Sequence, residues 1–247
     1  MISKAKSRFI KELQVKKYRL AEQCFLVQGA KAVKETLSSD YKIHTLAGTT
    51  EFFGSLSATS MSHVKEILEV SEKELTSLGS VEANNSALAV VQMKAPHKPV
   101  LSPNEFALVL DDIRDPGNLG TIIRTADWYG LKNIIASPET TDVYSPKVIN
   151  ATMGSFLRVS VFYSALDNFL ANTSLPVYGT FLTGENVHAV NFEKGGLIVV
   201  GNESKGISPT VEKMVTHRIT IPRMGAAESL NASTATAIVL DNLRRRS

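Results

Sequence analysis

Two short runs of consecutive apolar residues constrain the fold of this chain most strongly. Phe106–Leu110 reads FALVL and Leu197–Val200 reads LIVV, without the alternation of apolar and polar residues expected of a strand with one solvent-exposed face. Such runs are typical of strands in a parallel sheet that helices cover on both faces. Helical spacing alternates with further short strands from residue 104 onward, so we predict an α/β domain built on a parallel sheet.

The elements predicted around these runs follow one another in alternation. Helices are predicted at 121–129, 146–151, 166–171 and 209–214, and strands at 133–136, 157–162, 177–181 and 218–221. The stretch Ile219–Leu243 begins as a β-branched strand, passes through a loop that contains Gly225, and enters a helix at Glu228–Asn231. A strand, a glycine-bearing loop and a helix N-terminus together form a common ligand-binding arrangement.

The first 93 residues also alternate between helix and strand. The sequence predicts helices at 3–22 and 30–37, strands at 24–27, 42–46 and 87–93, and short helical or mixed segments at 62–70 and 71–78. Ser71 and Glu74 have the spacing of a capping box. Proline-dense sequence follows at 94–103, and because proline resists both helix and sheet, we place the domain boundary there. We therefore predict a small α/β domain at 1–95, a linker at 96–103 and a larger domain at 104–247.

Basic residues are concentrated at the two ends of the chain, although the net charge is only +3. Lys and Arg occupy seven of the first 20 residues against the single acidic Glu12, and Arg244–Arg246 lie at the other end. Basic ends favour a polyanionic partner such as RNA. A solvated helix face and a solubilising tail would give the same pattern, so charge alone leaves both interpretations open.

Cys24 is the single cysteine, which excludes a disulfide framework and a cysteine-ligated zinc site and favours a reducing compartment. The N-terminal residues contain no apolar run of the ~7–15 residues that a signal peptide needs. No run approaches the ~18–20 apolar residues of a membrane span. We expect a cytoplasmic protein with no membrane partner.

Three polar loops are the candidates for chemistry, and each follows a predicted parallel strand that ends at Leu110, Val200 or Ile221. The carboxyl ends of parallel strands share one edge of the sheet, and ligands of open α/β sheets bind at that edge. The loops match neither of two common phosphate-binding motifs. Ile207 occupies the lysine position of a P-loop in GNESKGIS, and DPGNLG has two glycines three apart in place of GxGxxG.

Individual polar residues in these loops have ordinary structural explanations. A surface position, or an ion pair with Asp127 or Asp115, would explain Arg124. Capping of the helix that follows would explain Glu203, and also Asn231. A functional interpretation therefore depends on the combination of these residues.

Three stretches carry a resemblance to a known family. LDDIRDPGNLGTIIRTADWYG (Leu110–Gly130), LIVVGNESKGIS (Leu197–Ser208) and ITIPRMGAAESLNASTA (Ile219–Ala235) resemble, in order and spacing, the three motifs of the SpoU family. Members of this family are RNA ribose 2′-O-methyltransferases of the SPOUT superfamily that use S-adenosyl-L-methionine (AdoMet). The resemblance covers residues ~100–247, and the first ~93 residues resemble more loosely the small RNA-binding domain that often precedes this catalytic domain.

The resemblance implies a deep trefoil knot near the C-terminus, a homodimer whose active site draws on both chains, and AdoMet as methyl donor with no metal. Chain physics alone would argue against the knot, since true knots are rare. Carried over by motif position, AdoMet is expected against Gly201, Ile221 and Leu230, with Thr180 bordering the same pocket. The residues that match the family's catalytic and substrate-positioning positions are Asn118, Arg124, Glu203, Ser229 and Asn231.

The proposed chemistry suits these residue types. A ribose 2′-hydroxyl must attack the sulfonium methyl group in line, and holding the two reactants at attack distance lowers much of the barrier. The family's counterpart of Arg124 is credited with activating the hydroxyl. Since the pKa of arginine lies above ~12, we expect Arg124 to bind the adjoining phosphate and the 2′-oxygen and to stabilise developing negative charge. The proton would then leave to phosphate or water. Two departures from the family pattern, Ala232 and Arg223, leave this chemistry intact.

We therefore predict a two-domain, AdoMet-dependent methyltransferase that acts on the ribose of structured RNA, with rRNA favoured over tRNA. Two alternatives stay open: a tRNA 2′-O-methyltransferase, and a non-catalytic RNA-binding or ribosome-assembly protein that keeps the fold. The intact catalytic positions argue against the non-catalytic alternative. An α/β enzyme that uses another nucleotide is disfavoured by the missing phosphate-loop residues.

Overall fold

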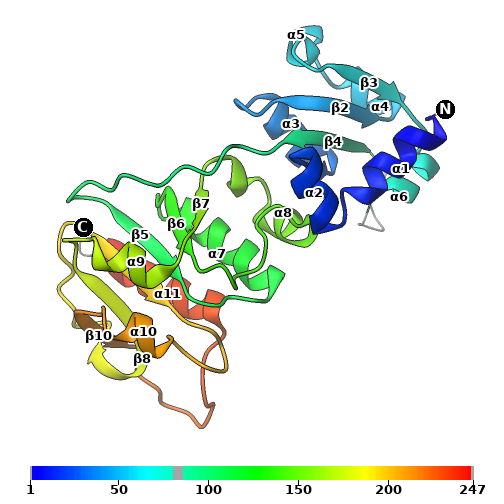
Figure 1. Ribbon diagram of the computed structural model, residues 1–247. Coiled ribbons are helices and arrows are strands. Elements are labelled where there is room, and N and C mark those ends of the chain that lie inside the picture. Colours follow the sequence, from blue (N-terminus) through cyan, green and yellow to red (C-terminus); the bar gives the residue numbers. More distant parts are fainter. Residues whose placement is uncertain (1, 80–85, 246–247) are drawn as a thin grey trace. The chain divides into compact units, whose positions relative to one another are not determined.

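The computed structural model describes residues 2–79 and 86–245 and divides into two compact units (Figure 1). The N-terminal unit consists of Met1–Ala95 and Tyr144–Leu157, and the C-terminal unit consists of Pro96–Val143 and Arg158–Ser247. Two segments that are distant in the sequence therefore build the N-terminal unit.

A mixed four-stranded sheet forms the centre of the N-terminal unit, in the order β1-β4-β2-β3. Its strands are β1 (Cys24–Gln28), β2 (Ile43–Gly48), β3 (Glu66–Glu69) and β4 (Ala87–Gln92). β4 pairs antiparallel with both β1 and β2, whereas β3 pairs parallel with β2. The helices of the first segment are α1 (Lys4–Glu12), α2 (Lys16–Glu22), α3 (Ala30–Leu37), α4 (Thr50–Gly54), α5 (Ala58–Met61) and α6 (Glu72–Leu78).

The two faces of this sheet carry separate apolar clusters. Alternate residues of β1 face opposite sides, with Phe25 in one cluster and Leu26 in the other. The cluster around Leu26 includes Ile10 beside α6 residues such as Leu75. The cluster around Phe25 includes Phe156, and the rings of these two residues meet edge to face with centroids 5.8 Å apart.

The segment Tyr144–Leu157 thus completes the core of the N-terminal unit. It contains α8 (Pro146–Thr152) and the short 3-10 helix η1 (Ser155–Leu157). Ile149 and Phe156 are only 2% and 4% exposed. The sequence assigned this segment to the larger domain at 104–247, and the functional assignment of the two units stays a prediction.

A parallel six-stranded sheet forms the C-terminal unit, in the order β10-β8-β9-β5-β6-β7, as the apolar runs predicted. Its strands are β5 (Phe106–Leu110), β6 (Asn133–Ala136), β7 (Ser160–Tyr163), β8 (Val177–Asn186), β9 (Gly196–Val200) and β10 (His217–Thr220). The paired strands β5 and β9 lie at the centre and are almost fully buried. The prediction of a parallel α/β sheet is confirmed.

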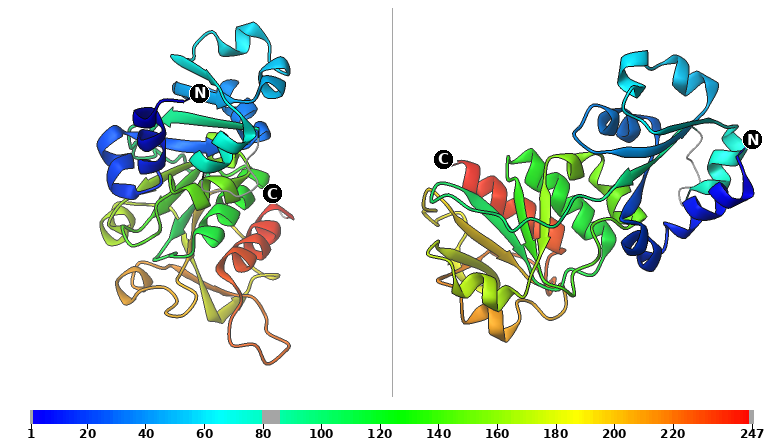
Figure 2. Two further views of the ribbon diagram at one scale, coloured as in Figure 1. Left: turned by 90° about the vertical axis from the view of Figure 1, so that its right-hand side faces the viewer. Right: turned by 45° about the horizontal axis from the view of Figure 1, so that its top comes forward.

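The helices of the C-terminal unit are α7 (Pro116–Trp128), α9 (Leu166–Ala171), α10 (Pro209–Glu212) and α11 (Ala232–Arg245). The C-terminal α11 packs against α7, and the two helices lie side by side in Figure 2. The guanidinium of Arg244 donates to the carbonyl of Tyr129 at 2.8 Å, which fixes the end of α11 to the end of α7. Two residues 115 positions apart in the sequence are thereby brought together.

Three predicted helix boundaries are wrong, and side-chain hydrogen bonds explain each error. The single helix expected at 3–22 is broken into α1 and α2, with Arg19 donating to the carbonyls of Leu13 and Gln14 at 3.1 and 2.8 Å. α7 begins at Pro116, five residues earlier than expected, because Asp115 caps it. α11 begins at Ala232, so the helix start expected at Glu228 is in fact loop.

Several other elements also differ from expectation. The segment predicted as helical or mixed at 62–70 contains the strand β3, and α4 and α5 were not predicted. β8 continues through Asn186, well beyond its predicted end. The capping box of Ser71 and Glu74 at the start of α6 is confirmed. Within the described ranges, no helix has both the length and the hydropathy to cross a bilayer.

Candidate active site

The loops that follow β5 and β9 are tied to each other at the carboxyl edge of the parallel sheet. Asp111, which is 6% exposed, accepts a hydrogen bond from the backbone N–H of Ser208 at 2.7 Å. The side-chain amide of Asn202 donates to the carbonyl of Asp112 at 2.9 Å. These two bonds hold the loop after β9 against the loop after β5, because neither loop can move without breaking buried or half-buried polar contacts.

A tight turn positions Glu203 in the loop after β9. Asn202 and Gly206 exchange backbone hydrogen bonds of 3.1 and 2.8 Å, and the Asn202 side chain accepts from two backbone N–H groups within the turn. Gly201 immediately precedes this turn, and a Cβ atom at position 201 would collide with the backbone of Gly206 and Ile207. Only glycine fits at position 201 without moving this turn.

Three of the predicted catalytic residues, each from a different motif, form one hydrogen-bonded cluster. The side-chain amide of Asn118 donates to a carboxylate oxygen of Glu203. The side-chain amide of Asn231 donates to the side-chain oxygen of Asn118 at 2.8 Å. The Asn118 side chain thus donates a hydrogen bond to Glu203 and accepts one from Asn231, which fixes the orientation of its amide.

Asn231 combines two roles at the start of α11. Its side-chain oxygen accepts from the backbone N–H groups of Ser233 and Thr234 at 2.9 and 3.3 Å, so it caps the helix. Its amide nitrogen is then left pointing away from the helix, toward Asn118. The structural explanation and the functional explanation of Asn231 are therefore compatible.

Glu203 has Asn118 as its partner and does not cap the next helix. The N-cap residue of α10 is Ser208, and α10 has no side-chain cap hydrogen bond. Glu203 is only half-buried, which leaves part of its carboxylate accessible to a ligand.

Arg124 and Ser229 lie outside the cluster. Arg124 is exposed on α7, and neither suggested ion pair forms, because Asp127 pairs with Arg158 at 2.8 Å and Asp115 caps α7. In the part of the chain that the structure describes, the side chain of Arg124 has neither a hydrogen bond nor an ion pair. Ser229 is exposed in the loop after β10, also without a hydrogen bond to any described residue.

The predicted cofactor residues lie on β8 and on the loops that follow β9 and β10. The hydroxyl of Thr180 donates to the carbonyl of Val199 at 3.0 Å and so joins β8 to β9. Ile221 is half-buried and lines a hollow of about 440 Å³ beside α11, whereas the side chain of Leu230 is 45% exposed. The backbone N–H groups of 223–230 make no hydrogen bond within the described residues, so they are available to a ligand with acceptor atoms.

Sequence reasoning missed several residues that shape this site. Asp111 and Asn202 brace the loops, and His188 shares a 2.9 Å contact with the side chain of the buried Asn242 in the wall of the 440 Å³ hollow. The acidic pair at 111–112 follows an apolar run directly, but this pattern does not indicate which groups the two carboxylates contact. No cluster of three or more His, Cys, Asp or Glu side chains suited to a metal occurs in the described ranges.

Comparison with known proteins identifies similarity over both units. Residues 105–241 match the model of the SpoU rRNA Methylase family. Residues 4–89 match the model of the MRM3-like substrate binding domain.

Individual relatives are similar over nearly the full chain. The 23S rRNA (guanosine(2553)-2′-O)-methyltransferase RlmP of Bacillus subtilis is 28% identical, with 98% of each chain covered. The structure of an AdoMet-bound rRNA methyltransferase from Sinorhizobium meliloti is 30% identical, with a TM-score of 0.89 over 99% of this chain and 96% of that one. The SpoU methyltransferase AviRb from Streptomyces viridochromogenes, in complex with AdoMet, is 26% identical with a TM-score of 0.85 and covers 99% and 98% of the two chains.

Proposed function

Because the chain belongs to the SpoU rRNA methylase family, we propose that it transfers the methyl group of AdoMet to a ribose 2′-hydroxyl of rRNA. The single observation that supports this most strongly is the cluster of Asn118, Glu203 and Asn231, since it joins one residue from each of the three motifs. The relatives in Bacillus subtilis and Streptomyces viridochromogenes support the substrate class and the cofactor. A cytoplasmic location is part of this proposal.

The residues around the cluster fit AdoMet. Gly201 allows the close approach of two backbone segments, and Ile221 and Leu230 offer apolar surface for an adenine ring. The unpaired backbone N–H groups of 223–230 suit the acceptor atoms of adenine and of a carboxylate. AdoMet, when bound, supplies a methyl group on a positively charged sulfur. Thr180 lies in β8 beside this region, and we propose that it borders the cofactor.

The cluster and Arg124 then have separate roles in the proposed reaction. Asn118 and Asn231, held by each other and by Glu203, orient the ribose so that its 2′-oxygen faces the methyl group. Arg124 is free to bind a phosphate and the 2′-oxygen, where its charge stabilises the alkoxide that develops. Ser229, exposed in the loop after β10, is a further contact to the target nucleotide.

We also propose that the enzyme is a homodimer whose active site takes residues from both chains. Within one chain Arg124 does not reach the cluster by any hydrogen bond, although it belongs to the same proposed site. Arg124 and Trp128 are one turn apart on the exposed face of α7, and Trp128 is 85% exposed. A second copy seated on this face would cover Trp128 and bring Arg124 to the partner's cluster. The trefoil knot, formed by the loops around β10 and α11, is part of the same proposal.

The reaction is tested with purified protein, tritiated AdoMet and total RNA from a strain that lacks this gene, followed by mapping of alkali-resistant linkages. One new 2′-O-methyl site in rRNA is the expected result. A site in tRNA instead would favour the tRNA alternative. AdoMet binding without labelled RNA, even with pre-ribosomal particles as substrate, would contradict catalysis and favour an assembly factor.

Complementation between two inactive variants tests the shared active site. Arg124→Ala and Asn231→Ala should each abolish turnover, with AdoMet binding nearly intact for Arg124→Ala, because within the described residues that side chain makes no hydrogen bond to a predicted cofactor residue. When the two variants are co-expressed, mixed dimers contain one intact composite site, so about a quarter of wild-type activity should return under random pairing.

The control for this prediction is the mixture of each variant with itself, which should stay inactive. The emission of Trp128, the single tryptophan, provides an independent reading, since dilution that separates the copies should expose the indole and shift its emission. Failure of complementation together with emission that does not depend on concentration would contradict the dimer.

A further inference from the structure

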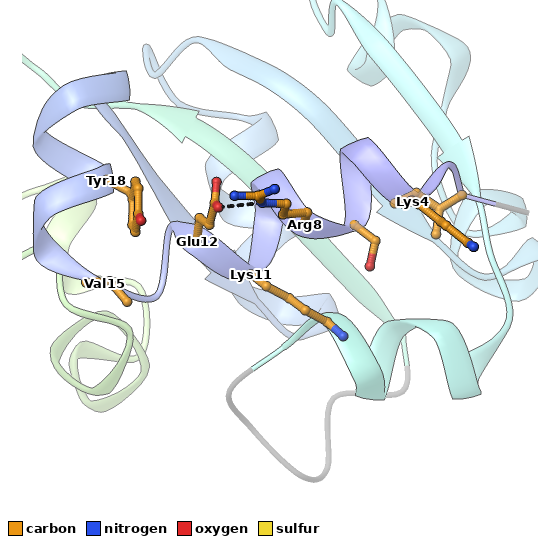
Figure 3. A pocket seen from close by; sticks show the side chains of 8 residues that line it. Lys4, Arg8, Lys11, Glu12, Val15 and Tyr18 are labelled. Carbon is orange, nitrogen blue, oxygen red and sulfur yellow. Dashed lines mark hydrogen bonds and ion pairs between the residues drawn. The ribbon is translucent and has the colours of Figure 1, made fainter.

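A basic hollow lies on the surface of the N-terminal unit, outside the proposed site of methyl transfer. It occupies about 550 Å³ along α1 and the start of α2. Figure 3 shows Lys4, Arg8 and Lys11 in a row along α1, with Tyr18 on α2 beyond Glu12. The volume is large enough for one nucleotide, since ligand pockets for small molecules begin at roughly 300 Å³.

The lysines of this hollow have no acidic partner. Arg8 pairs with Glu12 at 2.8 Å, so these two charges offset each other. Elsewhere on α1, Lys6 pairs with Glu66 at 2.6 Å. Among the described residues neither a carboxylate nor any hydrogen-bond acceptor holds the side chains of Lys4 and Lys11, and both are exposed.

Two apolar side chains stand at the other end of the hollow. Val15 and Tyr18 are 52% and 38% exposed although they lie in or beside a helix. The hydroxyl of Tyr18 has no hydrogen bond within the described ranges. Two more exposed lysines, Lys16 and Lys17, precede Tyr18 on α2. A row of cations that ends at an exposed aromatic ring is the combination that binds an unpaired nucleotide, with phosphate on the lysines and base on the ring.

We propose that this hollow is a second RNA-binding site, in which Lys4 and Lys11 hold the phosphates of a single-stranded segment and Tyr18 stacks on one of its bases. The proposal rests on the proposed function, because RNA is the substrate that would reach this surface. Because residues 4–89 match a substrate binding domain, the new element is the assignment of named side chains, and of a single strand as their ligand, to this hollow. Single-stranded RNA is favoured over a duplex because the ring of Tyr18 can stack only on a base that has left its own stack.

The phosphate contacts are tested in the full-length protein with Lys4→Gln/Lys11→Gln. The matched control is Lys31→Gln/Lys73→Gln, which removes the same charge from two exposed lysines on α3 and α6 of the same unit. Binding of a single-stranded oligoadenylate is measured across a range of KCl concentrations. Loss of two phosphate contacts should lower the slope of log affinity against log salt by about 1.4, since each contact to a single strand contributes about 0.7. The control pair should keep the wild-type slope.

The stacking contact is tested with Tyr18→Ala and Tyr18→Phe. Tyr18→Ala should weaken binding of the oligoadenylate about 5- to 150-fold, the range for removal of one stacked aromatic ring. Tyr18→Phe should bind like wild type, because the ring stays and the hydroxyl has no partner to lose. A duplex of the same length should show little difference between the three proteins.

Methyl transfer separates this proposal from the proposed function. With rRNA as substrate, Lys4→Gln/Lys11→Gln and Tyr18→Ala should raise KM for RNA about tenfold or more while kcat and AdoMet affinity stay unchanged. If wild type methylates rRNA and these variants match the control pair in KM and salt slope, the anchor is overturned and the function stands. If wild type methylates no RNA, both are overturned. Lysine-dependent binding to phosphatidylglycerol vesicles without any effect on RNA would also overturn the anchor.

Discussion

Asn118 shows how one side chain can be fixed from two directions. Its oxygen accepts from Asn231 and its nitrogen donates to Glu203, so a side chain that is symmetric in shape has only one satisfactory orientation. Its backbone N–H is bound as well, to the carboxylate of Asp115 at 2.8 Å. An amide held in this way needs no rearrangement when a substrate arrives, which is the property expected of a positioning group.

The substitution Asn118→Asp should therefore damage the site more than its size suggests. It replaces the N–H that faces Glu203 by an oxygen, so two carboxylates would meet where one hydrogen bond existed. We expect kcat for methyl transfer to fall by about 10²-fold or more, with less effect in Asn118→Ala, which leaves no second charge. Single-turnover transfer from tritiated AdoMet measures the effect, and circular dichroism checks the fold. Equal activity of the two variants would contradict this account.

The sequence alone identified the members of this cluster but not their contacts. Asn118, Glu203 and Asn231 were found by motif position, and helix capping would explain Glu203 or Asn231 when each is taken singly. Only the chain's path brings residues 85 and 113 positions apart within hydrogen-bonding reach. The bracing by Asp111 could not be predicted, because its partner is a backbone N–H, which every residue but proline carries.

At the scale of elements, side-chain caps decided the boundaries that hydrophobic spacing could not. Asp115 and Pro116 are a standard helix start, but two nearby glycines made the same stretch look like a loop. Asn231 caps α11, so that helix begins after it rather than at Glu228. β8 is longer than predicted because its exposed second half pairs with β10, at a register shift that local alternation does not reveal.

The break between α1 and α2 depends on Arg19, which predicts a specific stability effect. Arg19 is 2% exposed, and its guanidinium satisfies the carbonyls of Leu13 and Gln14 that the end of α1 leaves open. Arg19→Ala should lower the free energy of unfolding by about 1–3 kcal/mol, the cost of leaving buried polar groups unsatisfied. Urea unfolding followed by circular dichroism measures this difference.

A matched comparison uses Arg8→Ala on the same pair of helices. Arg8 is exposed and its ion pair with Glu12 is of the i,i+4 surface type, so Arg8→Ala should lower the free energy of unfolding much less than Arg19→Ala does. Equal losses for the two arginines would show that the carbonyl contacts of Arg19 do not hold the break together.

At the scale of the whole molecule, the sequence predicted the two alternating α/β regions. It did not predict that the later segment Tyr144–Leu157 packs in the N-terminal unit. Ile149 and Phe156 are apolar residues of the kind that pack a helix onto a sheet. Nothing in the local sequence indicates which of the two sheets they cover. In the structure both belong to the core of the N-terminal unit. The partner of a buried side chain is a property of the complete chain, so periodicity alone did not supply it.

A fragment that begins at the proline-rich linker should consequently expose apolar surface and aggregate. Residues 96–247 would retain Ile149 and Phe156 without the β1 surface that covers them, including the ring of Phe25. We expect this fragment to bind the dye ANS strongly and to elute as aggregates in size-exclusion chromatography, since large exposed apolar patches promote association. Ile149→Ser/Phe156→Ser in the fragment should reduce both signals. An unmodified fragment that is monomeric and does not bind ANS would contradict this division.

The same segment has a consequence for the order in which the protein is made. A ribosome synthesises Met1–Ala95 first, but the core of that unit also needs Tyr144–Leu157, which emerges only after two strands of the second sheet. The early part of the nascent chain must therefore remain with part of one face of its sheet uncovered, at the stage when chaperones bind it. Translation stalled before residue 144 should leave that part sensitive to protease, and stalling well after residue 157 should protect it.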